Sequence, residues 1–152
     1  MITNQNPLKK GYEYLDYNTR IRLLKKSITS KKLIIKNFEK KTKSVLLIDN
    51  LDYIKRSFPK NKFIFLMGTD SFLEIDKWKK YDKIFKQMPL AIFNRHGTKK
   101  KSLESKVSIK YKDYKFDHRT KKDIFKNIPG WYLINDFDVR ESSTNLRQKS
   151  KV

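Results

Sequence analysis

The stretch FIFLMGTDS, residues 63–71, decides the fold of this chain. Its first five residues are apolar without alternation, which is typical of a parallel strand buried on both faces. Gly68 then permits a turn and a close approach of a ligand to the backbone. Because ligands of open parallel sheets bind beyond the carboxyl ends of the strands, Gly68 and Asp70 are candidate binding residues. The alternative is an ordinary helix start, with Asp70 or Ser71 as the N-cap.

Two helices are predicted before this stretch, because apolar residues recur there at helical spacing. The first set is Tyr17, Ile21, Leu24 and Ile28, and the second is Leu47, Leu51, Ile54 and Phe58. Pro59 ends the second helix. Between the two helices, the apolar run 33–35 predicts a short strand.

After residue 71 the pattern alternates between helix and strand. A helix is predicted to begin near Ser71 and another to run through residues 81–85, and residues 90–93 and 131–134 are apolar runs typical of buried strands. Strands separated by helices predict β-α-β crossovers and a parallel sheet. The predicted fold class is α/β.

The domain organisation is predicted to be simple, since the chain has 152 residues and neither an internal repeat nor a long linker. That length suits one domain, spanning 1–152. Residues 98–127 are rich in lysine and weakly periodic. We expect them to form a variable loop or insertion with little core.

The formal net charge is +21, which raises the possibility of a polyanionic partner such as nucleic acid. Of the 37 basic residues only seven are arginine, however, and base recognition prefers the planar guanidinium. The alternative is a solvated lysine surface. In either case the field would concentrate phosphate ligands such as ATP.

Several function classes are excluded by the composition. The chain contains no cysteine, so disulfides, thiolate catalysis and cysteine zinc sites are ruled out. His96 and His118 each stand among lysines without a paired acid at motif spacing, and we expect neither to act as an acid or base. No metal site is predicted. The sequence also lacks an apolar run long enough for a membrane span, and we expect a cytoplasmic protein without a membrane partner.

Further candidate residues lie outside the opening stretch. Ser142, Ser143 and Thr144 offer hydroxyls and amides at a predicted helix start, with Arg147 one turn on, which suits anionic phosphates or simple capping. Trp78 could stack on an aromatic ligand or fill the core. Arg95 follows the strand 90–93 and could reach a phosphate or a base, or lie on the surface.

Taken together, these motifs resemble those of bacterial nicotinate-nucleotide adenylyltransferase. The matching pieces are residues 65–71 with Trp78 seven residues on, residues 91–97, and residues 142–147, in the family's order. The family pattern has an apolar strand ending G-A-D-S with a following W, a strand ending R-x-G, and S-S-T-x-I-R. Residues 6–9 also look like the loop after the family's second strand. The resemblance covers most of the chain except residues 99–127.

The resemblance implies a Rossmann-like sheet and transfer of the adenylyl group of ATP to nicotinate mononucleotide, an NAD-biosynthetic step that uses Mg²⁺ with ATP. It implies that Gly68, Asp70 and a phosphate-binding group bind ATP, and that Trp78 stacks on the nicotinate ring. The phosphate-binding group consists of Ser142, Ser143, Thr144 and Arg147. Arg95 and Lys9 would be further phosphate or base contacts.

The sequence also departs from the family pattern. The family begins with a strand and a G-G-x-F-x-P-x-H-x-G-H loop whose histidines contact the ATP phosphates, and this chain lacks that motif. We therefore expect the first strand and helix of the fold to be missing, we assign no catalytic residue, and the activity of this chain by itself is left open. The nicotinate-recognition region matches Leu46, Leu47, Asp49 and Asn50 without the family's threonines. The alternative functions are a basic nucleic-acid-binding module and a non-catalytic nucleotide-binding fragment.

Overall fold

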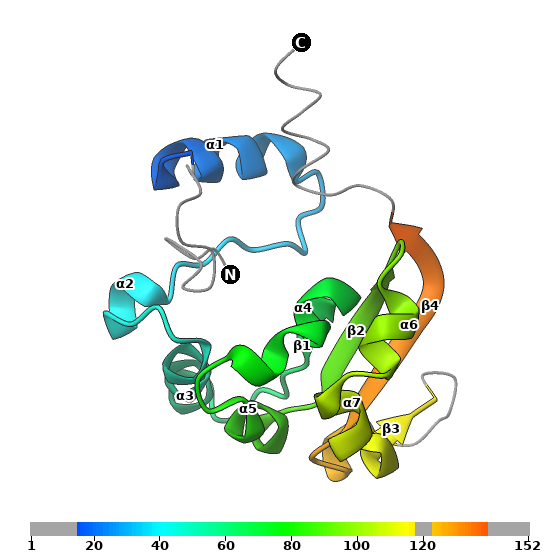
Figure 1. Cartoon of the computed structure of the whole chain (residues 1–152). Coiled ribbons are helices and arrows are strands. Elements are labelled where there is room, and N and C mark those ends of the chain that lie inside the picture. The colour runs from blue at the N-terminus through cyan, green and yellow to red at the C-terminus, as the bar shows by residue number, and fades with distance from the viewer. Residues whose placement is uncertain (1–14, 118–122, 140–152) are drawn as a thin grey trace. The chain divides into compact units, whose positions relative to one another are not determined.

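The computed structural model describes residues 15–117 and 123–139 and divides into two compact units, Met1–Asn61 and Lys62–Val152 (Figure 1). The side chains of residues 136–139 are outside this description. Each unit is considered by itself. The prediction that 1–152 forms a single domain stays a prediction.

The described part of the first unit is helical. It contains α1 (Tyr17–Ser27), α2 (Glu39–Thr42) and α3 (Leu47–Ser57). The Asp16 carboxylate caps α1 by accepting a hydrogen bond from the Thr19 N–H at 3.0 Å. Helix α3 ends two residues before Pro59, as a proline requires. Both helices predicted from apolar spacing are therefore confirmed.

The strand predicted at residues 33–35 is wrong. The segment has no regular secondary structure, and Leu33 and Ile34 are 62% and 72% exposed. A strand needs a neighbour to satisfy its backbone groups, and none of the described residues pairs with this segment. An apolar run of three residues was too short to predict a strand.

The second unit is built on a parallel sheet whose strands lie in the order β1-β2-β4-β3 (Figure 1). All three strand pairs are parallel, with Met67 opposite Ile92 in the first pair and Ile92 opposite Leu133 in the second. The strands are β1 (Phe65–Gly68), β2 (Leu90–Arg95), β3 (Lys115–Phe116) and β4 (Trp131–Val139). The predicted α/β class is confirmed.

Short helices connect these strands. They are α4 (Thr69–Leu73), η1 (Ile75–Lys77), α5 (Tyr81–Gln87), α6 (Lys99–Leu103), α7 (Lys106–Lys110), η2 (Lys112–Tyr114) and η3 (Ile124–Lys126). Helix α4 begins two residues earlier than the sequence indicated. The predicted helix at residues 81–85 is confirmed as α5.

The core lies against one face of the sheet. Its buried residues include Met67, Leu90, Ile92, Trp131 and Leu133 from the strands. Successive strand residues point to opposite faces, so Leu66 points away from this core and is 60% exposed. The expectation that the strand at residues 63–67 is buried on both faces is therefore wrong for Leu66.

Residues 98–127 contribute more to the core than expected. Val107 of α7 and Tyr111 directly after it are 1% and 5% exposed. The Tyr111 ring stacks on Phe85 with centroids 4.1 Å apart, and its carbonyl accepts a hydrogen bond from Trp131 Nε1 at 2.8 Å. The expectation of little core was wrong, because two apolar residues at i and i+4 are enough to anchor a short helix. Variability of the segment stays a prediction.

A polar cluster links α5 to the C-terminal end of α7. The Asp82 Oδ1 atom accepts hydrogen bonds from Lys110 Nζ at 2.7 Å and from Tyr111 Oη at 2.9 Å. The hydrogen bond from Lys110 is the main reason that the pKa of Asp82 is lowered. Burial, followed by the hydrogen bond to Asp82, raises the pKa of Tyr111 to about 12.

Truncation of Val107 tests whether this segment stabilises the fold. We expect Val107→Ala to lower the free energy of unfolding by about 2 kcal/mol, because the lost methyl groups come from a packed core. Ile109→Ala, on the same helix, is the control: Ile109 is 61% exposed and should change stability by less than about 0.5 kcal/mol. Urea denaturation followed by circular dichroism measures both, and equal losses would contradict the assignment.

The Asp82 cluster predicts a dependence of stability on pH. Since the pKa of Asp82 is lowered by folding, its contribution is fully present above the unfolded value of about 3.9. The contribution is lost as the pH falls through the folded pKa. Asp82→Asn should therefore destabilise the protein at pH 7, and the difference from wild type should shrink below about pH 4. Urea midpoints at several pH values measure this, and a constant difference down to the lowest pH would argue against the ion pair.

Candidate active site

The carboxyl ends of β1 and β2 lie side by side, because the two strands pair in parallel with Gly68 opposite Phe93. Gly68 is the N-cap of α4, and this helix start has no side-chain capping hydrogen bond. Asp70 lies within the first turn of the helix, so the alternative that Asp70 or Ser71 is its N-cap is wrong. The Asp70 carboxylate is thus left for contacts beyond its own helix.

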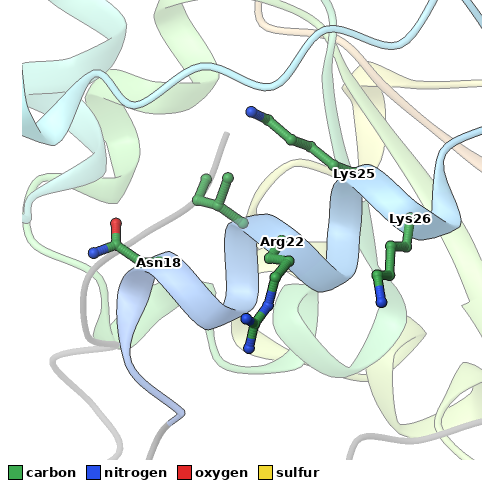
Figure 2. A pocket seen from close by; sticks show the side chains of 5 residues that line it. Asn18, Arg22, Lys25 and Lys26 are labelled. Atoms are coloured by element: carbon green, nitrogen blue, oxygen red, sulfur yellow. The ribbon is translucent and has the colours of Figure 1, made fainter.

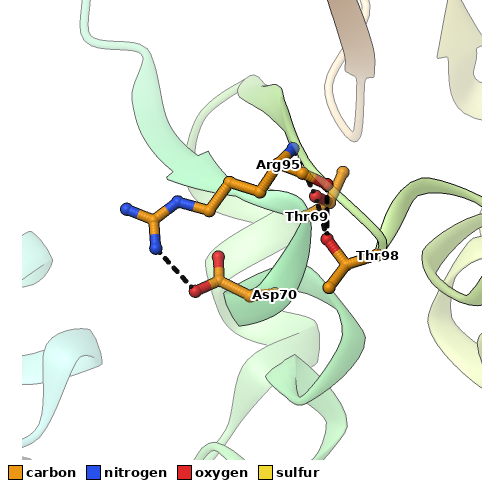
Figure 3. A network of polar contacts seen from close by, with 4 residues as sticks. All are labelled: Thr69, Asp70, Arg95 and Thr98. Atoms are coloured by element: carbon orange, nitrogen blue, oxygen red, sulfur yellow. Dashed lines mark hydrogen bonds and ion pairs between the residues drawn. The ribbon is translucent and has the colours of Figure 1, made fainter. Parts of the chain in front are cut away.

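Asp70 faces Arg95 from the neighbouring strand end (Figure 3). Arg95 Nη1 lies 2.9 Å from Asp70 Oδ2, and the two side chains are 41% and 42% exposed. The pair therefore joins an element after β1 to the last residue of β2, at the edge of the sheet where ligands of such folds bind.

Gly68 leaves the space in which this pair sits. A Cβ atom at this position would overlap Asp70 Oδ1 and lie 3.0 Å from the Cδ and Nε atoms of Arg95. A side chain at residue 68 would therefore push the pair apart. Glycine at this position leaves room for the two side chains as well as for any approach of a ligand to the backbone.

Two buried oxygen atoms near the strand ends lack a hydrogen-bond partner among the described residues. They are Asp70 Oδ1 and Asn94 Oδ1. A buried acceptor without a donor is destabilising, and such atoms in a folded protein call for an explanation. A ligand that donates hydrogen bonds, such as a ribose or an exocyclic amine, would satisfy them.

Two threonines that the sequence analysis did not select complete the site. Thr69 Oγ1 lies 2.6 Å from Thr98 Oγ1 and accepts a hydrogen bond from the Arg95 N–H at 2.9 Å. Thr98 Oγ1 in turn donates to the Arg95 carbonyl at 3.0 Å. The threonines are 29 residues apart in sequence, so only their place after two paired strands could have indicated the contact.

Trp78 lies partly in the core. Its ring packs edge-on against Phe65, with centroids 6.4 Å apart and an interplanar angle of 78°, and it is half-buried beside the main cluster. The remaining exposed part of the ring can still contact a ligand. The nicotinate contact stays a prediction.

The remaining predicted contacts fall outside the described residues. This applies to Lys9 and to the phosphate-binding group Ser142, Ser143, Thr144 and Arg147. Of the site residues predicted from sequence, the structure brings together Gly68, Asp70 and Arg95.

In the first unit, the residues matched to nicotinate recognition are engaged in local structure. Asn50 is fully buried, donates to the Ser44 and Leu46 carbonyls at 3.1 and 2.9 Å, and accepts from Thr42 Oγ1 at 2.9 Å. Asp49 accepts a hydrogen bond from Ser44 Oγ at 2.6 Å. These bonds hold the connection between α2 and α3.

A cavity of about 440 Å³ lies along α1, and none of the residues that line it is a predicted site residue. Figure 2 shows its lining of Asn18, Ile21, Arg22, Lys25 and Lys26, all from one helix. The basic side chains favour an anion electrostatically. The lining contains no acid and no buried polar group that would fix a ligand, so we do not assign a site there.

Neither a membrane helix nor a metal cluster is found within residues 15–117 and 123–139. No helix in these ranges is long and apolar enough to cross a bilayer. No three side chains of His, Cys, Asp or Glu come together there as a protein-held metal ion would require.

Comparison with curated proteins confirms the resemblance. The chain is 26% identical over 99% of its length to a probable nicotinate-nucleotide adenylyltransferase of Agrobacterium fabrum, of which it covers 81%. A protein of the same name from Pelagibacter ubique is 37% identical over 68% of this chain and is covered over 57% of its own length.

A solved structure agrees with the fold. The nicotinic acid mononucleotide adenylyltransferase of Plasmodium falciparum, complexed with APC, superposes with a TM-score of 0.53 at 21% identity. The match covers 85% of this chain and 56% of that one. At this identity the likeness supports the Rossmann-like parallel sheet.

The family assignment rests on nearly the whole sequence. The cytidylyltransferase-like profile matches residues 1–149, which include both strand ends that carry Gly68, Asp70 and Arg95. The chain belongs to the cytidylyltransferase-like family of nucleotidyltransferases.

Proposed function

We propose that this chain binds ATP at the carboxyl ends of β1 and β2 and serves in the transfer of its adenylyl group to nicotinate mononucleotide. The products are nicotinate adenine dinucleotide and pyrophosphate. The observation that carries the proposal is Asp70, whose Oδ1 atom is buried without a partner beside Gly68, while Oδ2 binds Arg95. The names of the curated relatives support the choice of reaction.

The chemistry needs no protein nucleophile. A phosphate oxygen of the mononucleotide attacks the α-phosphorus of ATP, the new P–O bond forms, and the bond to pyrophosphate breaks. The protein contributes by holding the two nucleotides in line and by neutralising the charge that builds on the phosphates. The net charge of +21 also attracts both anionic substrates.

Each site residue has a part in this scheme. Asp70 accepts hydrogen bonds from the adenosine ribose, Gly68 allows the ligand to approach, and Arg95 contacts a phosphate or the base. Trp78 stacks on the nicotinate ring. Lys9 is a further phosphate contact, together with Ser142, Ser143, Thr144 and Arg147.

Magnesium enters this scheme bound to ATP, as part of the substrate. The phosphate oxygens of ATP are ligands of the kind that Mg²⁺ prefers, and Asp70 is engaged with Arg95. The soluble substrates suit the cytoplasmic location that the sequence predicts.

Removal of the Asp70 charge tests the nucleotide site. We expect Asp70→Asn to weaken ATP binding by about tenfold or more, because a hydrogen bond to a charged group contributes about 1.5–3 kcal/mol. Glu74→Gln is the matched control, since Glu74 pairs with Lys77 at the surface and should leave ATP affinity unchanged. Isothermal titration calorimetry with ATP, and with CTP for comparison, measures the effect.

Three results would contradict the proposal. Equal ATP affinity in Asp70→Asn would remove Asp70 from the site, and preference for CTP would change the transferred group. Tight, steeply salt-dependent binding of mixed-sequence RNA without ATP binding would favour a nucleic-acid-binding protein instead. Chromatography of a mixture with ATP, magnesium and nicotinate mononucleotide then shows whether the dinucleotide forms.

Truncation of Trp78 tests the second substrate. Trp78→Ala should weaken nicotinate mononucleotide binding by at least about fivefold, since stacking on an aromatic ring contributes about 1–3 kcal/mol. ATP affinity of the same variant should stay within about twofold, which controls for damage to the fold. Trp78→Phe keeps a ring against Phe65 and should retain most of the affinity. Unchanged mononucleotide binding in Trp78→Ala would assign Trp78 to the core alone.

A further inference from the structure

We propose that Thr69 and Thr98 are positioning residues that fix the direction of the Arg95 side chain through a closed ring of hydrogen bonds around the Arg95 backbone. The inference rests on the proposed function, because Arg95 is taken to act on the nucleotide. Neither threonine needs to touch the ligand.

The ring follows from the distances and from the single proton on each hydroxyl. The Arg95 N–H donates to Thr69 Oγ1 at 2.9 Å, and Thr98 Oγ1 donates to the Arg95 carbonyl at 3.0 Å. Thr98 has then used its proton, so Thr69 must be the donor in the 2.6 Å contact between the two hydroxyls. All the bonds run in one direction and return to the same residue (Figure 3).

The surroundings of Thr98 indicate that its hydroxyl is committed to this ring. Thr98 is the N-cap of α6, a position at which a threonine side chain commonly accepts from the first turn of its helix. Here it makes no such bond. Its backbone still serves the helix, since the Thr98 carbonyl accepts from the Ser102 N–H at 2.9 Å. The hydroxyl points instead at the strand ends.

The hydrogen-bond ring holds the Arg95 backbone at a point where the pairing of β2 with β4 becomes irregular. The register of β2 against β4 shifts between Phe93 and Arg95, and such irregularities redirect side chains at the ends of strands. Thr69 is fully buried, which shields its bonds from water and strengthens them. With N–H and C=O both held, the Arg95 backbone has little freedom to turn.

A fixed backbone matters because the Arg95 side chain is long and 41% exposed. A guanidinium on a freely turning backbone would sample many directions, and ordering it would lower the affinity for a ligand. With the ring closed, the guanidinium already points to Asp70 at 2.9 Å. The hydrogen-bond ring thus places Arg95 beside Asp70 before the nucleotide binds.

The test compares two substitutions of Thr98 in the full 152-residue chain. Thr98→Val keeps the shape without the hydroxyl and should weaken ATP binding by about fivefold to tenfold, a loss of one to two hydrogen bonds. Thr98→Ser restores the hydroxyl and should bind ATP within about twofold of wild type. Ser102→Ala is the control, because Ser102 is buried in the helix that Thr98 caps and its hydroxyl donates to the Lys99 carbonyl at 2.7 Å rather than to Arg95.

A second readout works without any ligand. The Arg95 Nε–H resonance in NMR spectra should be sharp and protected in wild type and Thr98→Ser, and broadened or lost in Thr98→Val. Unchanged ATP affinity in Thr98→Val with an unchanged Arg95 resonance would overturn the proposal. So would an equal loss of affinity in Ser102→Ala, which would indicate general destabilisation. If wild type does not bind ATP at all, the proposed function fails, while the resonance still decides whether the ring orients Arg95.

Discussion

The fold of the second unit depends on the hydrogen bonding of β2 along both of its edges. Leu90, Ala91 and Ile92 are fully buried, and each backbone group on this strand needs a partner from β1 or β4. Parallel neighbours cannot be joined by tight turns, so the chain must leave the sheet and return through helices. The same constraint places the ends of β1 and β2 at one edge, where Asp70 meets Arg95.

Both units contain buried apolar side chains, which in the first unit are Ile48 and Leu51, but the first unit also has a buried polar network. In the second unit, aromatic and aliphatic side chains pack on one face of the sheet. The ring centroids of Trp131 and Phe72, for example, are 5.0 Å apart. In the first, α1 buries none of its residues, and the buried Asn50 joins the ends of α2 and α3 through polar contacts. A network of this kind specifies one geometry, because each unpaired group would be destabilising.

Apolar patterning was sufficient to predict α1, α3, α5, β2 and β4, because α3 carries helical spacing and β2 is a continuous apolar run. It failed where tertiary context decides the outcome. The apolar run 33–35 has no strand to pair with among the described residues. Val107 lies in the core, but the lysines around it in the sequence gave no helical pattern of apolar residues. Gly68 and Asp70 were visible as a motif next to a strand. The contact between Thr69 and Thr98 was not, because it depends on which strands are neighbours in the sheet.

The hydrogen-bond ring around Arg95 also constrains how this sequence can change over time. Loss of the Thr69 hydroxyl removes the acceptor of the Arg95 N–H. After loss of the Thr98 hydroxyl, in contrast, the Arg95 carbonyl still accepts from the Thr98 N–H at 3.2 Å. The two threonines therefore differ in what their loss leaves unpaired, and Thr69, which is fully buried, is the position where an apolar replacement leaves a peptide N–H without a partner. Residue 69 should therefore change less freely than residue 98 among descendants of this chain, although each looks like an ordinary polar position when considered alone.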